Sequence, residues 1–393
     1  MVKVGIFLNS PDIFLAPLWR ALSQVKDLKI KVFYFSDICS DGYSLQDKTQ
    51  NGADYVLAGY QYEFIKSCNK NPHKLKLAEP GKLLNREVFD VIMLCGYHQP
   101  YERQIRKLAR KFNFKIIFRG EITDMQRSSN IFTTVSRHLY LRWFYSGISA
   151  FCPIGRDAEN HLLDKGIPEG KLFFSPNAVD DQFIEKQKNI YKREAVREEL
   201  GIGDTDVVFL FSGSIDQCNQ PLLLAEAVME LSDYPQLVMI FIGDGKQYHD
   251  VCKMLTSKFG NRIIIPGYCD QNRTSYFFAA ADVFVLPSEY DPWCLAVNQA
   301  MHWGMPVIVS DRCGCCRDLV IDGYTGYSFY YRDKESLVRY MRKFLVEPEL
   351  SSKMGRSAYK EIRNYTLDLS VDGITGAIKY VTGRVPLAEI LQK

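Results

Sequence analysis

Short apolar runs alternate with amphipathic stretches along most of the chain. The apolar runs are typical of strands buried on both faces of a sheet, and the stretches between them have helical spacing, as at residues 101–112. This order predicts βαβ units and therefore α/β domains with doubly wound parallel sheets. Strands are predicted at residues 2–8, 30–35, 91–95, 115–118, 150–154 and 172–175, then at 207–211, 238–242, 283–286 and 306–310, with one more beginning at residue 263.

A polar, charged stretch at residues 176–203 interrupts the alternation. Such a change in composition is typical of a segment between domains, and 393 residues fit two domains of ordinary size. We therefore expect a first domain at residues 1–180, a linker at 181–204 and a second domain at 205–366. Residues 367–393 are predicted to be helical and have no strand partner of their own.

The composition indicates a globular protein, with 47% hydrophobic and 24% charged residues. No apolar run approaches the length that crosses a bilayer, and the N-terminal residues lack the apolar core of a signal peptide, so we expect a cytoplasmic protein. The net charge is only +3, but residues 101–150 hold ten basic and three acidic side chains. This part of the first domain is expected to face something anionic.

Eleven cysteines in a chain without an export signal indicate reduced thiols rather than disulfides. Cys313, Cys315 and Cys316 lie close together in the sequence, but this tight spacing without a second Cys or His pair suits tetrahedral zinc poorly. We therefore expect small side chains in a tight loop, with no metal site and no cofactor.

The segment at residues 281–326 carries the most chemical information. A buried strand leads into a polar turn that contains Asp291, and then come a helix, a second strand and a loop rich in Gly and Cys. This order brings polar groups and a helix N-terminus together at the carboxyl ends of parallel strands, where open α/β sheets bind nucleotides. A nucleotide site is therefore expected here.

The same segment resembles the retaining glycosyltransferases of family 4, which have the GT-B fold. Their motif is a carboxylate, seven residues, a second carboxylate and Ala-Met, followed by Gly and Pro-Val. Asp291 stands at the first carboxylate position and Gln299 at the second. The rest of the motif is matched by Ala300, Met301, Gly304, Pro306 and Val307.

Smaller pieces extend the resemblance over most of the chain. The run from Asn177 to Asp180 resembles the Asn-Gly-Val-Asp that closes the first domain in this family, and Gly243-Asp244-Gly245 resembles the family's Gly-Asp-Gly. The resemblance implies two facing Rossmann-like doubly wound domains, with a C-terminal helix that crosses back to pack on the first.

By the same resemblance, Asp291 contacts the donor hexose, and Gln299 contacts the ribose through a neutral amide. Gly213, Ser214 and Asn219 lie around the diphosphate. The predicted donor site is completed by Gly243, Gly267, Tyr268, Arg312 and Gly314.

The chain departs from the family pattern in this donor site. Relatives carry two cations after the first strand of the second domain, five residues apart, where this chain has Ser214 and Asn219. Each lost charge-assisted hydrogen bond to phosphate is worth ~1.5–3 kcal/mol. We expect Arg312 or Arg273 to supply substitute charge. In addition, Cys294 replaces a Gly that lets the backbone approach the ligand.

In the first domain, two predicted strand ends carry polar side chains. Arg119 is an always-charged fork suited to phosphate or carboxylate, and Glu121 follows it on the acceptor side. The alternative for Arg119 is a surface ion pair with Glu121 or Asp124. His98 either bonds a sugar or acceptor, or is a loop histidine whose hydrogen bonds are satisfied. We predict that Arg119 and His98 act with Asp291 in catalysis.

A basic, aromatic segment at residues 136–147 allows two interpretations. It is either a peripheral membrane contact that reaches a lipid-linked acceptor, or an amphipathic helix whose aromatic side chains pack inward. The second is favoured because the apolar residues are not confined to one face. The residues concerned are Arg137, Tyr140, Arg142, Trp143 and Phe144.

The sequence therefore predicts a metal-independent glycosyltransferase of the hexosyltransferase type. It would move a sugar from a nucleotide-diphosphate sugar to a glycan or lipid-linked acceptor with retention, in the cytoplasm or on the inner face of a membrane. The departures at the donor site leave open a degenerate GT-B protein that acts as a binding or regulatory partner. A nucleotide-sugar epimerase is less favoured, because its paired carboxylates and His are not evident, and nucleic acid is not an expected partner.

Overall fold

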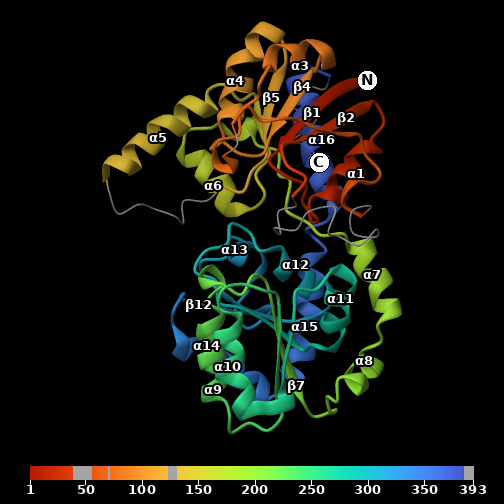
Figure 1. Ribbon diagram of the computed structural model, residues 1–393, viewed down its shortest axis with the longest axis vertical. Coiled ribbons are helices and arrows are strands. Elements are labelled where there is room, and N and C mark those ends of the chain that lie inside the picture. The colour runs from red at the N-terminus through yellow and green to blue at the C-terminus, as the bar shows by residue number, and fades with distance from the viewer. Residues whose placement is uncertain (39–54, 70, 123–130, 385–393) are drawn as a thin grey trace. The chain divides into compact units, whose positions relative to one another are not determined.

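The chain folds into two compact units, each built on a six-stranded parallel sheet with helices on both faces (Figure 1). Unit 1 comprises residues 1–178 and the segment from residue 367 onward, and unit 2 comprises residues 179–366. The expected fold class, with two doubly wound Rossmann-like sheets, is confirmed. The structure, a computed structural model, describes residues 1–38, 55–69, 71–122 and 131–384.

The sheet of unit 1 has the strand order β3-β2-β1-β4-β5-β6. Its central strand β1 is apolar except at Lys3, its single exposed residue, as expected for a strand covered on both faces. The strands are β1 (Val2–Leu8), β2 (Leu28–Tyr34), β3 (Tyr62–Phe64), β4 (Val91–Leu94), β5 (Lys115–Phe118) and β6 (Ala150–Phe151).

Two apolar cores lie on the two faces of this sheet. One contains side chains of α1 and α16, including Trp19 and Ile374. The other is rich in aromatic residues and contains side chains from the remaining helices, such as Tyr101 and Phe144. The helices are α1 (Ala16–Ser23), α3 (Pro80–Glu87), α4 (Pro100–Phe112), α5 (Ile131–Tyr145), α6 (Arg156–Asp164) and α16 (Leu367–Val381).

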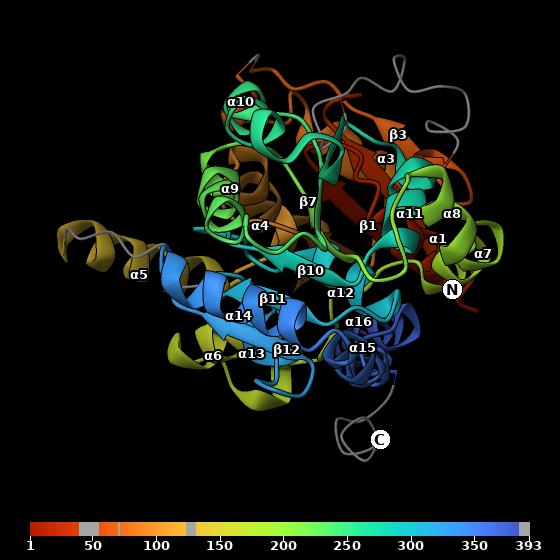
Figure 2. The same cartoon turned by 90° about the horizontal axis from the view of Figure 1, so that it is seen from below.

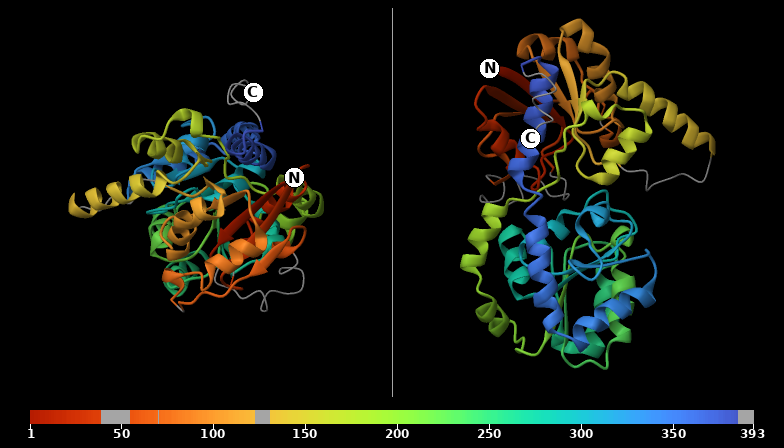
Figure 3. Two further views of the ribbon diagram at one scale, coloured as in Figure 1. Left: turned by 90° about the horizontal axis from the view of Figure 1, so that it is seen from above. Right: turned by 180° about the vertical axis from the view of Figure 1, so that it is seen from behind.

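Helix α16 belongs to unit 1, although it follows the whole of unit 2 in the sequence. It packs against α1 (Figures 1 and 3), and Ile374, Ala377 and Ile378 are almost completely buried in their shared core. At Gly373 the helix lies directly against the backbone of Phe174. A Cβ at this position would lie 2.0 Å from the carbonyl oxygen of Phe174. The close contact explains why no larger residue is found at this position.

The sheet differs from the sequence prediction at its edges. Residues 172–175 are not a strand, and β6 ends at Phe151. The backbone N–H of Phe173 donates to Phe151, but on its other side the segment is tied to α16, where the Ser175 hydroxyl donates to the carbonyl of Ser370 over 3.0 Å. Its backbone pairing with β6 is limited to an isolated bridge between Phe151 and Leu172.

The sheet of unit 2 has the order β12-β11-β10-β7-β8-β9 and is also parallel throughout. The edge strand β12 was not predicted. It begins at Gly326, where a Cβ would lie 2.0 Å from the carbonyl oxygen of Val307, so its first residue must be glycine rather than a typical strand former. The strands are β7 (Val207–Ser212), β8 (Leu237–Ile242), β9 (Ile263–Gly267), β10 (Val283–Leu286), β11 (Val307–Ser310) and β12 (Gly326–Phe329).

Helices cover both faces of this second sheet (Figure 2). Helix α9 packs with α10 and α14, and α12 packs with α15. The helices are α7 (Asp181–Ile190), α8 (Arg193–Glu199), α9 (Pro221–Glu230), α10 (Tyr248–Phe259), α11 (Gln271–Ala280), α12 (Leu295–His302), α13 (Cys316–Leu319), α14 (Lys334–Val346) and α15 (Glu349–Ile362).

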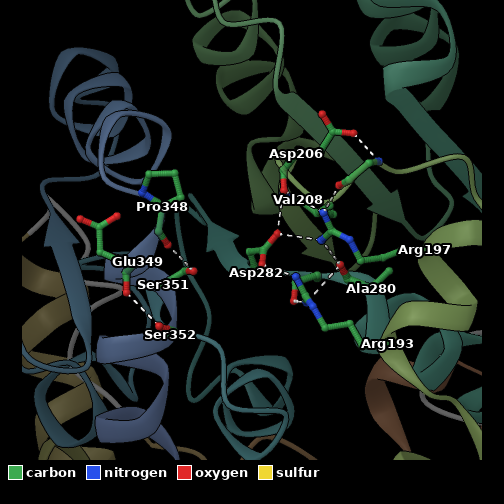
Figure 4. Close-up of polar contacts among 12 residues, drawn as sticks. Arg193, Arg197, Asp206, Val208, Ala280, Asp282, Pro348, Glu349, Ser351 and Ser352 are labelled. Carbon is green, nitrogen blue, oxygen red and sulfur yellow. Dashed lines mark hydrogen bonds and ion pairs between the residues drawn. The ribbon is translucent and has the colours of Figure 1, made fainter.

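Residues 181–204, which the sequence assigns to a linker, contain helices α7 and α8 and are part of unit 2. Two arginines of α8 hold Asp282, which directly precedes β10 (Figure 4): Arg193 lies 2.5 Å and Arg197 3.1 Å from its carboxylate oxygens. Arg197 is buried and also donates to the carbonyls of Gly203 and Asp206. The charged composition that resembles a linker thus serves a buried ion-pair network.

Candidate functional site

Glycines join three loops at the carboxyl ends of β7, β8 and β9. The N–H of Gly213 donates to Ile242, and the N–H of Gly243 donates to Gly267 over 2.9 Å. Gly243 has φ +137°, and a Cβ there would lie 1.9 Å from the carbonyl oxygen of Gly213. Three residues predicted for the donor site therefore lie on loops that only glycine allows to pack this closely.

Asn219 holds the loop after β7 together through neutral hydrogen bonds. Its amide nitrogen donates to the carbonyl and the hydroxyl of Ser214 at 3.0 and 2.9 Å, and its amide oxygen accepts from Ser288 over 2.9 Å. Both positions at which relatives carry cations are thus occupied by an uncharged pair. Helix α9 begins two residues later, and the N-terminus of a helix attracts anions.

The loop that carries Asp291 contacts its neighbours on both sides. The N–H of Glu289 donates to Cys218 in the loop after β7, and the N–H of Asp291 donates to Arg312 in the loop after β11. The carbonyl of Asp291 accepts from Gly314 over 2.9 Å. The structure therefore brings the predicted residues Asp291, Arg312 and Gly314 onto adjoining loops, next to the loop of Asn219.

The carboxylate of Asp291 is half-buried and accepts the backbone N–H of Trp293 over 2.9 Å. Burial raises the pKa of Asp291, whereas hydrogen bonds from Trp293 and Cys294 act in the opposite direction. Gly314 leaves no room for a side chain, because a Cβ would lie 2.0 Å from the carbonyl oxygen of Pro292. Asp291 is thus held in a fixed place by backbone contacts.

Helix α12 begins at a strained residue, since Cys294 precedes it with φ +76°. A non-glycine residue in this region is disfavoured, and this is the position where relatives carry Gly. Gln299 lies on the same helix, half-buried, and its side chain makes no hydrogen bond within the described part of the chain.

Two cations were expected to replace the missing ones. The guanidinium of Arg312 lies 4.5 Å from the ring centroid of Tyr331, on the loop next to Asp291. Arg273 is exposed on α11, where it lies over the ring of Phe277. Only Arg312 is joined by a backbone contact to the loop of Asp291. Tyr268 follows Gly267 directly and is 41% exposed.

Sequence reasoning missed Ser288, which is completely buried. Besides its bond to Asn219, its carbonyl accepts the hydroxyl of Ser310, so it joins the ends of β10 and β11. A small polar residue directly after a buried apolar strand is the signal that could have found it. Another missed contact is the ion pair between Glu289 and Arg332, at 2.5 Å.

Arg119, which was predicted to contact a substrate, is instead bonded to other parts of unit 1. Arg119 is buried, and its guanidinium donates to the Ser175 hydroxyl at 3.0 Å, the carbonyl of Pro176 and the amide oxygen of Asn177 at 2.9 Å. The amide nitrogen of Asn177 donates to Glu121 over 2.9 Å. Arg119 therefore does not lie at the surface, where an ion pair with Glu121 or Asp124 was considered, and Asn177 bonds to both Arg119 and Glu121. Asp124 lies outside the described residues.

His98 is exposed just before α4, and its carbonyl accepts from Arg103. Its pKa is lowered by partial burial of the ring and by the nearby charges of Arg137 and Arg103. No hydrogen bond in the described part of unit 1 joins its ring to Arg119 or Glu121. The structure therefore groups Arg119 with Glu121 and leaves His98 apart.

The cysteines of the loop after β11 are buried thiols. Burial raises the pKa of Cys316 to about 12, and that of Cys315 is raised in the same way. Among the residues that the structure describes, no group of three or more His, Cys, Asp or Glu side chains is arranged to hold a metal ion. The described residues also contain no helix long and apolar enough to cross a membrane.

Comparison with known proteins identifies the second half of the chain. Residues 192–361 match the family model of glycosyl transferases group 1. The sulfoquinovosyl transferase SQD2 of Arabidopsis thaliana is 29% identical over 178 residues, which cover 44% of this chain and 34% of that protein. An Escherichia coli UDP-Gal:alpha-D-GlcNAc-diphosphoundecaprenol alpha-1,3-galactosyltransferase is 26% identical over 231 residues, 57% of this chain and 58% of that protein. The matches thus span between a third and three fifths of these relatives.

Solved structures match over nearly the whole chain. Sucrose-phosphate synthase from Thermosynechococcus elongatus has a TM-score of 0.73 at 14% identity and covers 98% of this chain and 100% of its own. Anabaena HepE in complex with UDP and glucose has a TM-score of 0.69 at 15% identity, with 97% and 100% covered. At such low identity the likeness establishes the fold. Residues 192–361 therefore match the glycosyl transferases group 1, and the whole chain has the GT-B fold of family 4 structures.

Proposed function

We propose that the chain transfers a hexose from a nucleotide-diphosphate sugar to an acceptor, with retention at the sugar. The observation that carries the proposal is the joining of loops at the carboxyl ends of the unit 2 strands, where backbone hydrogen bonds connect the Asp291 loop to those of Cys218 and Arg312. Open α/β sheets bind nucleotides at this edge. The match of residues 192–361 to the glycosyl transferases group 1 supports the proposal, and HepE has been solved with UDP and glucose.

In this proposal each loop has a distinct role. Retaining transfer builds negative charge on the departing diphosphate and positive charge on the sugar ring, so donors must lie at the phosphates and acceptors at the sugar. We assign the phosphates to the amides around Gly213, to the N-terminus of α9 and to Arg312. The carboxylate of Asp291 is assigned to the donor hexose and Gln299 to the ribose.

Calorimetric titration with UDP, GDP and dTDP sugars tests the donor site. One of them should bind and be consumed with an acceptor. Asp291→Asn retains the oxygen that caps the N–H of Trp293 but removes the charge, so it should lower turnover without unfolding the loop. Asp204→Ala, at an exposed position of unit 2, is the control. A folded protein that gives no heat with any donor would contradict the proposal.

A second candidate is a GT-B protein that binds nucleotide sugars without transferring them. The observation that favours it is the neutral network of Ser214, Asn219 and Ser288, because it uses the Asn219 amide at a place where relatives offer cations to the diphosphate. The two candidates differ in turnover. Binding of a donor without release of free nucleotide, with or without acceptors, would support the binding protein.

For the acceptor we propose a lipid-linked glycan reached at a membrane surface. The name of the E. coli relative specifies a diphosphoundecaprenol-linked acceptor. In unit 1, helix α5 exposes Val135, Leu139 and Trp143, which are spaced four residues apart on one side, with Arg142 beside them. Such a combination suits the boundary between headgroups and acyl chains. The exposed His98 is assigned to the same acceptor side, and so is the exposed Glu121, which Asn177 connects to the buried Arg119.

A further inference from the structure

A cavity of about 490 Å³ lies in unit 2 and shares no residue with the loops described above. This volume is within the range of small-molecule sites, roughly 300–1,000 Å³. Helix α7, the turn after α12 and helix α15 border it, and it is open to solvent on the side of Ser352 and Arg356. Its walls include Lys188, Trp303, Gly304, Ser352, Arg356 and Tyr359.

The lining residues include two cations and no carboxylate, but the carboxylate of Glu185 lies beside them and accepts from the Tyr359 hydroxyl over 3.4 Å. The ammonium of Lys188 lies 2.7 Å from Glu185 on its own helix and 4.6 Å from the ring centroid of Tyr359. Arg356 is exposed, and its guanidinium makes neither an ion pair nor a hydrogen bond with any residue that the structure describes. The cavity therefore offers an anion one cation without a protein partner and a second beside it.

A second cavity, in unit 1, shows the contrast. Its walls include Glu63 and Glu79 as well as Lys82 and Arg86. Glu63 is already paired with Arg86 at 2.7 Å, and Glu79 with Lys82 at 2.5 Å. Its charges are therefore satisfied by each other, and it offers no preference for one sign of ligand.

Two half-buried aromatic residues, Trp303 and Tyr359, complete the walls of the unit 2 cavity. Ser352 adds a hydroxyl, whose hydrogen is donated to the carbonyl of Glu349 over 3.0 Å (Figure 4). Aromatic faces bind flat or apolar bodies, whereas a guanidinium fork binds a phosphate through charge-assisted hydrogen bonds. The walls thus suit a ligand with a phosphate at one end and a compact body at the other.

The floor of the cavity is rigid backbone. A Cβ at Gly355 would lie 1.9 Å from the carbonyl oxygen of Gly304, so α15 lies directly on the turn after α12.

We infer that this cavity binds a small phosphomonoester, with its phosphate between Arg356 and Lys188 and its body against Trp303 and Tyr359. The ligand would connect α7, which begins just after Val179, to α15, which ends just before Thr366. Val179 and Thr366 are the first and last residues of unit 2. Both helices therefore lie next in sequence to the points where the chain passes between the units. The site is separate from the donor loops and independent of the proposed function.

Calorimetry of the full chain with glucose 6-phosphate tests the inference. Glucose 6-phosphate should bind and glucose should not, because the phosphate supplies the charge. Arg356→Gln should weaken binding by about tenfold or more, since it removes a charge-assisted pair. Lys353→Gln, an exposed position on the same helix that does not line the cavity, should leave it unchanged. Trp303→Leu should weaken it to a smaller extent.

Three results would overturn the inference. They are the absence of binding heat, an equal loss in the Lys353 and Arg356 variants, and a loss of glucose 6-phosphate binding in Asp291→Asn, which would place the probe at the donor site. Vesicles that contain phosphatidic acid form a further arm. If they alone bind the chain in a way that requires Arg356, the soluble ligand is wrong and the phosphomonoester is a lipid headgroup. Nucleotide binding should be unchanged in Arg356→Gln in every case.

Discussion

At the scale of single residues, the loop after β7 is held by neutral hydrogen bonds at the positions where relatives carry cations. Asn219 connects Ser214 to Ser288, so the loop after β7 keeps its shape without a cation. In the proposed site the ligand binds less tightly as a result, because a phosphate gains less binding free energy from an amide than from an ammonium. The charge of this loop should therefore be adjustable by substitution at an exposed position.

Ser214→Lys should tighten nucleotide diphosphate binding by about tenfold, since one charge-assisted hydrogen bond is worth ~1.5 kcal/mol or more. Ser214 is exposed, so the longer side chain has room, and the bond between Asn219 and Ser288 remains. Gln217→Lys, an exposed position of the same loop, is the control. An unchanged Kd would mean that Arg312 already neutralises the phosphates, and Arg312→Ala should then be the damaging change.

His302 should make the protein less stable in mild acid. Burial lowers its pKa from 6.5 to about 4, and Lys188 acts in the same direction while Glu185 opposes it. Because the folded state binds the proton less tightly than the unfolded state, the stability that this group contributes is present above pH 6.5 and is lost as the pH falls through 4. The total is up to roughly 3 kcal/mol.

Urea unfolding of the wild type and of His302→Leu at pH 7.5 and 5 measures this contribution. Stability should fall less between these pH values in the variant than in the wild type. His249→Leu, on helix α10, is the control for loss of an imidazole. Equal pH dependence in wild type and His302→Leu would show that His302 has the same pKa in the folded and unfolded states.

At the scale of elements, helix α8 is held to the sheet of unit 2 by charge. Asp282→Ala should lower the free energy of unfolding by ~3–5 kcal/mol, because it leaves the buried Arg197 without its anion. Asp204→Ala should change it little, since Asp204 is exposed. Chemical denaturation of unit 2 measures the difference. A loss below 1 kcal/mol would mean that the carbonyls of Gly203 and Asp206 hold Arg197 on their own, given the ~1 kcal/mol worth of an ordinary hydrogen bond.

Helix α5 is the element of unit 1 that should contact the membrane surface. Sedimentation with anionic vesicles should be strong at low salt, weak at high salt, and reduced in Leu139→Asp and in Arg142→Glu, because each basic residue near the surface contributes ~1 kcal/mol. Arg137 is unsuitable for this test, since it donates to the Tyr97 hydroxyl. Val88→Asp, at an equally exposed apolar position of unit 1, is the control. Equal recovery with neutral and anionic vesicles would exclude the contact.

The sequence predicts the central elements well and the edges poorly. Strand β1 is apolar except at Lys3, and β7 is apolar up to its last residue, Ser212. Their burial on both faces can therefore be predicted without knowledge of tertiary contacts. The strand β3 has three residues with an acidic one in the middle, and residues 172–175 look like a strand but bond to α16. What these segments do depends on partners far away in the sequence, which no local pattern contains.

The candidate site shows the same division. Asp291 and Gly243 were predictable, because a motif and a turn type mark them. The hydrogen bonds of Arg119 were not predictable, because its partners at residues 175–177 follow it in the sequence by more than fifty positions. Trp143 was expected inside the protein but is 42% exposed, with the guanidinium of Arg106 3.9 Å from its ring, whereas Phe144 is fully buried. Helical spacing alone cannot decide which of two neighbouring aromatic residues faces inward.

At the scale of the whole molecule, unit 1 depends on a helix that unit 2 separates from it in the sequence. Gly373→Ala should destabilise unit 1 by ~1–3 kcal/mol, because the added Cβ would collide with the carbonyl of Phe174. Hydrogen exchange resolves the two units and should show faster exchange in β1 and α1, with β7 and β10 unchanged. Asp372→Ala, an exposed neighbour, is the control. Equal acceleration in both units would mean that they unfold together.

The position of α16 also sets an order of events on the ribosome. Residues 1–178 emerge first, but the helix that covers their apolar face follows only after residues 179–366 have been made. At ~5–20 residues per second, this delay lasts roughly ten to forty seconds. During this time the surface later covered by Ile374 and Ile378 is open to solvent, while unit 2 can close on its own. The nascent chain is therefore the state in which this protein most needs a chaperone.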